Sequence, residues 1–264
     1  MQKIRLGSVS YLNAKPLIYG LERDDGVELN LAVPSKLLEG LREGRFDVAL
    51  LPVIDYQRME GLRIVPSGGI GSDGETLTVR IFSRGPIEKI ERLACDTDSH
   101  TSVALARVLL AERYGRRPEL VDLGSKEAAG GFDGLLLIGD KVVCEEPEEY
   151  GEQIDLGESW KELTGLPFVF AAWMVRQGVE LGDLPMKLEA AKRAGLKHVD
   201  ELVRAYAVPR GWPAEVARRY LTQHLKYDIG PREIEAIALF HQLAAKHGVL
   251  AMPPRAVKMY KPGA

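Results

Sequence analysis

The pattern of apolar and polar positions predicts a chain that alternates strands with helices. Ile4, Leu6 and Val9 open it as a short apolar strand, which leads through a polar corner into a helix. The uninterrupted apolar run at 46–51 is typical of a strand buried in a parallel sheet. The first unit is therefore expected to be a doubly wound α/β layer. Its predicted elements are strands at 4–9, 27–33 and 46–51 and helices at 14–21 and 36–43.

A second unit repeats this order farther along the chain. The glycine-rich segment 68–74 predicts a flexible turn, and residues 76–84 predict a strand that leaves the first unit. The repetition indicates two lobes of similar topology. Short sequence echoes accompany it: Ser35-Lys36 with Ser125-Lys126, and Phe46-Asp47 with Phe132-Asp133. The elements predicted for the second unit are strands at 92–95, 119–123 and 132–138 and helices at 103–114 and from Ser125.

The remaining chain is expected to return to the first lobe. The acidic segment 147–155 predicts a loop, and the aromatic-rich run 167–176 predicts a long strand that pairs with 76–84. The tail from Pro253 is expected to lie loosely on the surface. Three amphipathic helices are predicted at 185–207, 213–225 and 231–247.

These elements predict an α/β fold of two lobes, with a ligand cleft between them and two crossing strands that join them. Lobe I is expected to comprise residues 1–86 and 177–264. Lobe II is expected to be an inserted α/β unit at 87–176.

Composition narrows the classes of partner. A net charge of −3, with scattered basic residues, argues against binding to nucleic acid or a membrane surface. No apolar run approaches the ~20 residues of a membrane-spanning helix. Met1-Gln2-Lys3 leads into the first strand with no signal peptide, so the cytoplasm is the expected location. The sequence has no pattern typical of a nucleotide-phosphate or metal site, and no cofactor is expected.

Polar residues gather in the loops that would face the cleft. Ser10, Tyr11 and Asn13 follow the first strand, at the start of a helix. Hydroxyls, amides and the free N–H groups of helix N-termini suit a small dicarboxylate. The candidates from the second lobe are Ser99, His100, Thr101, Ser102 and Asp140.

These candidates also have ordinary structural interpretations. The corner at 10–13 is equally consistent with a plain βα turn. Asp55 and Asp140 would serve as well as a cap or as a strand-end hydrogen-bond acceptor. His100 lies in a cleft loop, whereas the other four histidines fall in the C-terminal helices, where a surface or core position is favoured.

Six motifs, in order along the chain, resemble one known family. They are SYLNAKPL from Ser10, FDVALLPVIDY from Phe46, FSRGPIE from Phe82, DTDSHTSVAL from Asp96, LLIGD from Leu136 and GLPFVFAAW from Gly165. The chain is similar to the MqnA family, the chorismate dehydratases of the futalosine route to menaquinone. The resemblance implies a type II periplasmic-binding-protein-like fold in a cytoplasmic enzyme. It also implies a hydro-lyase that converts chorismate to 3-[(1-carboxyvinyl)oxy]benzoate and water.

The resemblance further implies roles for single residues. Asn13 is expected to hydrogen-bond the departing hydroxyl or to hold the ring. Thr78 stands where the family more often has Ser, which keeps a hydroxyl at this position. The residues expected to bind the two carboxylates are Ser10, Thr78, Thr101 and Ser102.

The general base stays open at this point. The candidates are the enolpyruvyl carboxylate of the substrate itself, Asp140 and His100. His100 stands where Arg is more common in the family. The sequence determines neither the oligomeric state nor the extent of lobe closure.

Two other functions remain as alternatives. The 1,4-dihydroxy-6-naphthoate synthase of the same pathway shares the fold, but its first corner is expected to be of a Cys-Pro-Asn type rather than Ser10-Tyr11-Leu12-Asn13. A non-enzymatic cytoplasmic protein that binds a small carboxylic acid would use the same cleft. Turnover separates these classes, because a binding protein returns its ligand unchanged.

Overall fold

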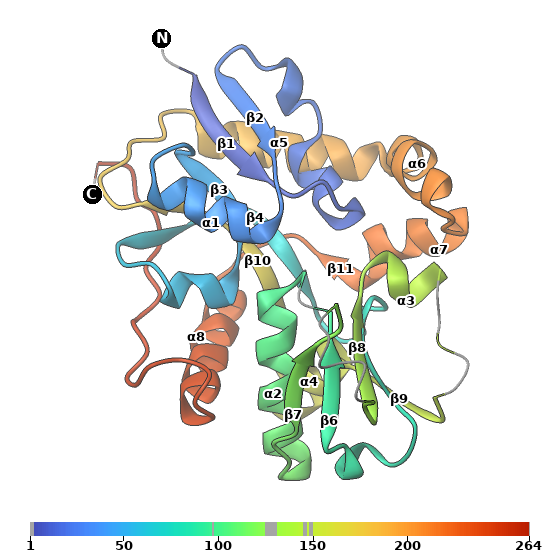
Figure 1. Cartoon of the computed structure of the whole chain (residues 1–264). Coiled ribbons are helices and arrows are strands. Elements are labelled where there is room, and N and C mark those ends of the chain that lie inside the picture. Colours follow the sequence, from blue (N-terminus) through green and yellow to red (C-terminus); the bar gives the residue numbers. More distant parts are fainter. Residues whose placement is uncertain (1–2, 97, 125–130, 145–146, 148–149, 264) are drawn as a thin grey trace.

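The computed structural model describes residues 3–96, 98–124, 131–144, 147 and 150–263 (Figure 1). The helix predicted from Ser125 lies outside these residues. The strands are β1 (Ile4–Ser8), β2 (Val27–Leu31), β3 (Val48–Pro52), β4 (Leu62–Ser72), β5 (Val79–Ser83), β6 (Arg92–Cys95), β7 (Glu119–Asp122), β8 (Gly134–Ile138), β9 (Glu152–Asp155), β10 (Phe168–Arg176) and β11 (Leu225–Lys226). The α-helices are α1 (Pro34–Arg42), α2 (His100–Tyr114), α3 (Asp140–Cys144), α4 (Leu156–Thr164), α5 (Leu184–Lys197), α6 (Val199–Leu202), α7 (Ala214–Arg219) and α8 (Pro231–Lys246).

These strands form two sheets, which occupy the upper and lower halves of Figure 1. The first sheet has the order β11-β4-β10-β3-β1-β2, and the second has the order β7-β6-β8-β5-β9. In the first, β1 pairs in parallel with β2 and β3, and the fully buried β3 confirms the strand expected from its apolar run. In the second, β6 pairs in parallel with β7 and β8. Each sheet thus contains a parallel α/β unit, as the repeated pattern predicts.

The predicted pairing of 76–84 with 167–176 is wrong. β5 pairs antiparallel with β8 and β9 of the second sheet, whereas β10 pairs antiparallel with β3 and β4 of the first. The two strands end in different sheets because each finds its partners within one unit. Residues 73–78 carry the chain from the first sheet to the second, and α4 carries it back. The division into lobe I (1–86 and 177–264) and lobe II (87–176) stays a prediction. β5, which falls in the predicted lobe I, belongs to the second sheet, and β10, which falls in the predicted lobe II, belongs to the first.

The glycine-rich segment is also not a turn, because β4 continues to Ser72. Glycines there allow neighbouring backbone to approach closely. A Cβ on Gly69 would lie 2.6 Å from the carbonyl oxygen of Ala171, and one on Gly71 would lie 2.5 Å from that of Phe168. The glycine cluster therefore reflects the close packing of β4 against β10 rather than a turn.

Two further segments are more ordered than their composition suggests. The acidic stretch 147–155 ends in β9, which pairs with β5. The tail packs against β4, where Tyr260 N donates to Ile64 O at 2.7 Å and Ile64 N donates to Lys258 O at 2.9 Å. The Tyr260 side chain is buried, so the expectation of a loose tail is wrong.

The helices differ from prediction mainly at their ends. The first corner leads into a 3-10 helix, η1 (Leu12–Ile18), whose N-cap position is Tyr11 rather than Asn13. α1 begins at Pro34, with Val33 at the N-cap position. The predicted C-terminal helices are present as α5 to α8, with π-helical turns at Val203–Ala207 and Tyr220–His224. Among the described residues, none of the helices combines the length and apolar character needed to cross a bilayer.

Candidate active site

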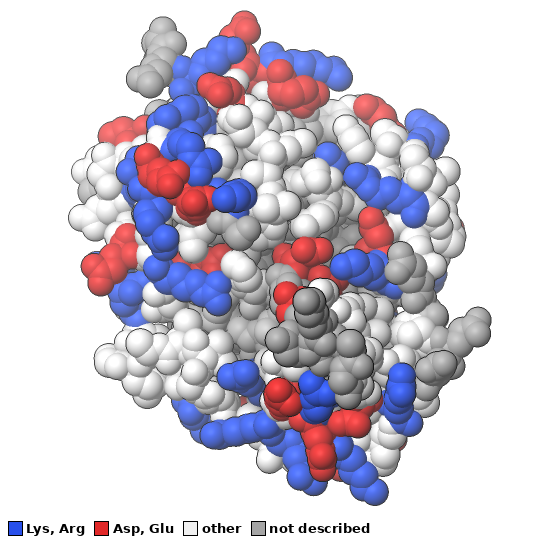
Figure 2. Space-filling model, viewed as in Figure 1, with Lys and Arg blue, Asp and Glu red and all other residues white. Residues whose placement is uncertain are grey.

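A pocket with a cavity volume of about 210 Å³ lies between the two sheets. Figure 2 shows this face of the molecule hollowed between its two halves, with charged side chains near the rim. The pocket is built from the corner after β1, the connection between β4 and β5, the loops after β6 and β8, and the C-terminal helices. Its polar lining residues are Tyr11, Asn13, Thr76, Thr78, Asp96, Asp98, Ser99, Ser102, Asp140, Lys141, Trp212 and Tyr220.

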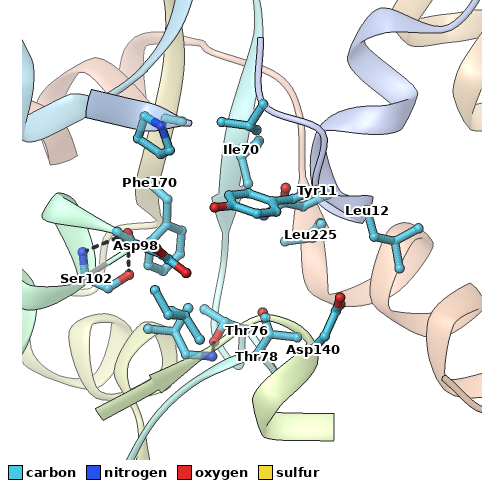
Figure 3. A pocket seen from close by; sticks show the side chains of 18 of the residues that line it. Tyr11, Leu12, Ile70, Thr76, Thr78, Asp98, Ser102, Asp140, Phe170 and Leu225 are labelled. Carbon is cyan, nitrogen blue, oxygen red and sulfur yellow. Dashed lines mark hydrogen bonds between the residues drawn. The ribbon is translucent and has the colours of Figure 1, made fainter. Parts of the chain in front are cut away.

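Six of the nine residues proposed from the sequence line this pocket. The ring of Tyr11 extends over it, and Thr78 and Asp140 lie across from that ring (Figure 3). Ser99 is the N-cap of α2, where its Oγ accepts from Ser102 N at 3.2 Å and lies 2.9 Å from Ser102 Oγ. The full set is Tyr11, Asn13, Thr78, Ser99, Ser102 and Asp140.

The structure does not bring the other three into the pocket lining. Ser10 is exposed. Thr101 is fully buried, and its Oγ1 accepts from Ile54 N at 3.4 Å. His100 Nδ1 lies 3.2 Å from the buried carboxylate of Asp55 and 2.9 Å from Arg58 Nη1. Thr101 and His100 therefore attach α2 to the segment after β3.

Asn13, Thr78 and Tyr220 form a hydrogen-bonded group at one wall. Thr78 Oγ1 donates to the Tyr220 hydroxyl at 3.1 Å. Burial raises the pKa of Tyr220 to about 12, although hydrogen bonds from Thr78 and Asn13 act in the opposite direction. Asn13 Oδ1 is buried and has no hydrogen-bond partner among the described residues. Because an unpaired buried acceptor is costly, this oxygen suits a ligand donor.

The charged lining residues pair with other protein groups. Asp140 Oδ1 accepts from Trp212 Nε1 at 2.7 Å, and its Oδ2 lies 3.8 Å from Arg210 Nε. Lys141 Nζ lies 2.6 Å from Asp96 Oδ2. Burial lowers the pKa of Lys141, but the hydrogen bond and charge of Asp96 outweigh it, so the pKa is raised.

Sequence reasoning missed several of these residues. Lys141 directly follows Asp140, the last residue of the LLIGD motif, and this adjacency is the signal that could have identified it. Trp212 and Tyr220 come from the C-terminal helical region, where no motif marks them as cleft residues. Thr76 is two residues from the predicted Thr78.

Metal ligands are not assembled in the part of the chain that the structure describes. No three His, Cys, Asp or Glu side chains there lie close enough to hold an ion. The pocket instead offers hydroxyls, one amide, one cation, three carboxylates and apolar walls that include Phe170, Ile70 and Leu225. Such a mixed lining suits a small organic molecule that carries polar groups.

Comparison with known families decides the relationship. A family model described as menaquinone biosynthesis matches residues 4–246. The chain belongs to this family. A chorismate dehydratase of Thermus thermophilus is 32% identical over 84% of this chain and 88% of the relative, and one of Campylobacter jejuni is 29% identical over 89% and 94%. A 1,4-dihydroxy-6-naphtoate synthase of Thermus thermophilus is 25% identical over 81% of each chain.

Solved structures give the fold. The protein AF1704 of Archaeoglobus fulgidus superposes with a TM-score of 0.72 at 17% identity, over 94% of this chain and 98% of that one. The periplasmic aliphatic sulphonate binding protein SsuA of Escherichia coli superposes with a TM-score of 0.68 at 15% identity, over 99% and 93%. The expected periplasmic-binding-protein-like fold is confirmed.

Proposed function

We propose that this protein is a chorismate dehydratase of menaquinone biosynthesis, which converts chorismate to 3-[(1-carboxyvinyl)oxy]benzoate and water. Two relatives of that name, similar over most of both chains, support the assignment, as does the family match. The observation in the pocket that carries the proposal is Asn13. Its buried Oδ1 has no partner among the described residues, and its side chain lines the cavity.

The reaction removes the C4 hydroxyl and the C3 proton of the chorismate ring, which together make one molecule of water. Aromatisation of the ring supplies the driving force. The protein therefore has to bind a dicarboxylate, orient the bonds that break and exclude competing rearrangements. These tasks call for positioned hydrogen-bonding groups more than for a strong acid or base.

Asn13 is our candidate for the catalytic residue. Its side chain acts on the Tyr220 hydroxyl, whose pKa it helps to lower against the effect of burial. Oδ1 would then accept from the C4 hydroxyl and hold this leaving group in the orientation that elimination needs. An aspartate at this position would place a negative charge beside an anionic substrate.

Hydroxyl groups would bind the two carboxylates. Thr78 and the Ser99–Ser102 pair at the start of α2 line the pocket, and the ring of Tyr11 lies across from Thr78. Hydroxyl donors at a helix N-terminus favour an anion. Ser10 and Thr101 are less suited to this role, because neither lines the cavity.

We favour the enolpyruvyl carboxylate of the substrate as the base that takes the C3 proton and then passes it to the departing C4 hydroxyl, which leaves as water. Asp140 is held by the Trp212 indole and lies close to Arg210, so its lone pairs are partly occupied. His100 faces Asp55 and Arg58 rather than the cavity. If the carboxylate of the substrate is the base, no protein side chain has to take the C3 proton.

We also propose that the enzyme acts in the cytoplasm on a small-molecule substrate, with its pocket between the lobes predicted at 1–86 plus 177–264 and 87–176. The naphthoate synthase alternative is less supported, since that relative is 25% identical whereas the dehydratase of the same organism is 32% identical.

The test is to incubate the purified protein with chorismate and follow the products by chromatography and ultraviolet absorbance. Asn13→Asp is compared with Asn30→Asp, which makes the same chemical change on β2, away from the pocket. The parent and Asn30→Asp should form the enolpyruvyl benzoate. Asn13→Asp should lose at least about 100-fold in kcat/KM.

The outcomes separate the functional classes. If the parent leaves chorismate to its spontaneous decay, the dehydratase assignment fails. Tight binding of chorismate without turnover would then support a binding protein. Equal activity of both variants would keep the dehydratase but remove Asn13 from its site.

A further inference from the structure

The two connections between the sheets pack directly against each other. Residues 73–78 lead from β4 to β5, and α4 begins the return to β10. Gly157, at the start of α4, has no room for a side chain: a Cβ there would lie 2.4 Å from Thr76 Cγ2 and 2.6 Å from Gly74 O. The outgoing connection therefore rests on the first turn of α4.

One carboxylate bonds both connections at this contact. Asp155 is buried, with 5% of its surface exposed. Its Oδ1 accepts from the backbone N–H groups of Gly157 and Glu158, at 2.9 and 3.1 Å, which makes it the N-cap of α4. The same carboxylate accepts from Thr76 N, Thr76 Oγ1 and Leu77 N, each at 2.9 Å. A helix cap alone needs only the first pair of bonds.

The segment that Asp155 holds has an unusual backbone. Leu77 has φ of +70°, and it is the only residue other than glycine with positive φ in the described part of the chain. This left-handed conformation is strained for a residue with a Cβ. Thr76 and Thr78, on either side of Leu77, both line the pocket. The strained residue thus sits where the chain presents two hydroxyls to the cavity.

We propose that Asp155 is a positioning residue, which locks the two inter-sheet connections together and thereby sets the places of Thr76 and Thr78 in the pocket. The inference rests on the proposed function, because the pocket so shaped is the one assigned to chorismate. Thr78 passes the constraint on, since its Oγ1 donates to Tyr220 and its carbonyl oxygen accepts from Gly139 N at 2.9 Å. Asp155 itself does not line the cavity.

Asp155→Asn separates this role from helix capping. Asparagine caps a helix about as well as aspartate, so its single oxygen can still serve Gly157 and Glu158. Its amide nitrogen would then face the N–H of Leu77, donor against donor. The matched control is Asp73→Asn, which removes an ion pair with Lys161 that links the same two connections at the surface.

Asp155→Asn should lower kcat/KM for chorismate about 10- to 100-fold, with kcat falling more than KM rises, because the hydroxyls stay in the pocket but are misplaced. Asp73→Asn should stay within about twofold of the parent. Values for Asp155→Asn within twofold of the parent would overturn the proposal.

A second substitution checks that the effect passes through Leu77. Leu77→Gly removes the steric cost of positive φ, so the segment depends less on the carboxylate. In that background, Asp155→Asn should cost no more than about threefold in kcat/KM. An unchanged cost would show that Asp155 acts in another way.

Backbone hydrogen exchange tests the same contact without chorismate. Asp155→Asn should lose protection at the amides of residues 76, 77 and 79, whereas Asp73→Asn should keep it. If the parent does not convert chorismate, the proposed function fails, and this measurement still decides on the positioning role. Unchanged protection in Asp155→Asn would reject that role by itself.

Discussion

Two sets of polar groups in the pocket are handled in opposite ways. In the neutral set, Asn13, Thr78 and Tyr220, one acceptor has no partner among the described residues. In the charged set, Asp140 and Lys141, both groups are partly exposed and each is paired with another protein group. A paired charge has part of its hydrogen-bonding capacity occupied, whereas an unpaired neutral acceptor is available to a ligand. The charged set therefore holds the site together, and the neutral set is free to meet the substrate.

The strongest test of this contrast in the neutral set is Tyr220→Phe. The change removes the hydroxyl to which Thr78 donates, so Thr78 loses its orientation. We expect kcat/KM for chorismate to fall about 30- to 100-fold. Thr78→Ser keeps the hydroxyl and should stay within about threefold. Steady-state kinetics that put both variants near the parent would remove this group from the mechanism.

A second prediction concerns His241 of α8, which is buried against the segment that follows β3. His241 is buried, with Nε2 2.9 Å from Val53 O and Nδ1 3.0 Å from Gln57 Nε2. Burial lowers its pKa to about 4, so the folded protein holds it neutral while the unfolded chain binds a proton below pH ~6.5. Its contribution to stability is complete above pH ~6.5 and is lost as the pH falls toward 4.

Urea unfolding should therefore show that protonation linked to His241 lowers the free energy of unfolding by about 2 kcal/mol as the pH falls from 7 to 5. His241→Gln, which can keep both hydrogen bonds, is the control: its unfolding free energy should lack that part of the pH dependence. An identical pH dependence in both proteins would mean that His241 can gain a proton in the folded state.

The smallest effect is expected in the charged set, from Asp140→Asn. The amide keeps an oxygen for Trp212 and gives up only the charge facing Arg210. If Asp140 is a structural hydrogen-bond acceptor rather than a base, kcat should fall by no more than about threefold, whereas loss of a general base lowers kcat about 100-fold or more. Asp140→Ala, which also removes the acceptor for Trp212, should be more impaired than Asp140→Asn.

Most of the fold can be predicted from the sequence, and particular elements show why. Apolar runs such as 46–51 become buried strands because nothing but a core position can accommodate them. The pairing of 76–84 with 167–176 is wrong because β5 lies between β8 and β9 and β10 lies between β3 and β4, and the local pattern carries no information on these distant partners. The glycines of β4 read as a turn because the backbone that packs against them comes from 168–171, far away in sequence.

The candidate site divides in the same way. Asn13 and Asp140 lie in loops that follow strands, and the topology predicts that those loops come together. Thr78 was identified only through the family resemblance. Tyr220 and Trp212 reach the pocket from helices whose apolar pattern reads as ordinary packing. His100 was placed in the cleft loop, yet α2 turns it toward Asp55, and a one-residue rotation on a helix is beyond what sequence spacing resolves.

The most direct test of the account is to measure chorismate turnover by the parent, Asn13→Asp and Asp140→Asn in one assay. The contrast between the neutral and the charged set predicts product from the parent, a loss of at least about 100-fold in Asn13→Asp, and a loss of at most about threefold in Asp140→Asn. Equal losses in the two variants, or a greater loss in Asp140→Asn, would contradict it and move the chemistry to the charged set.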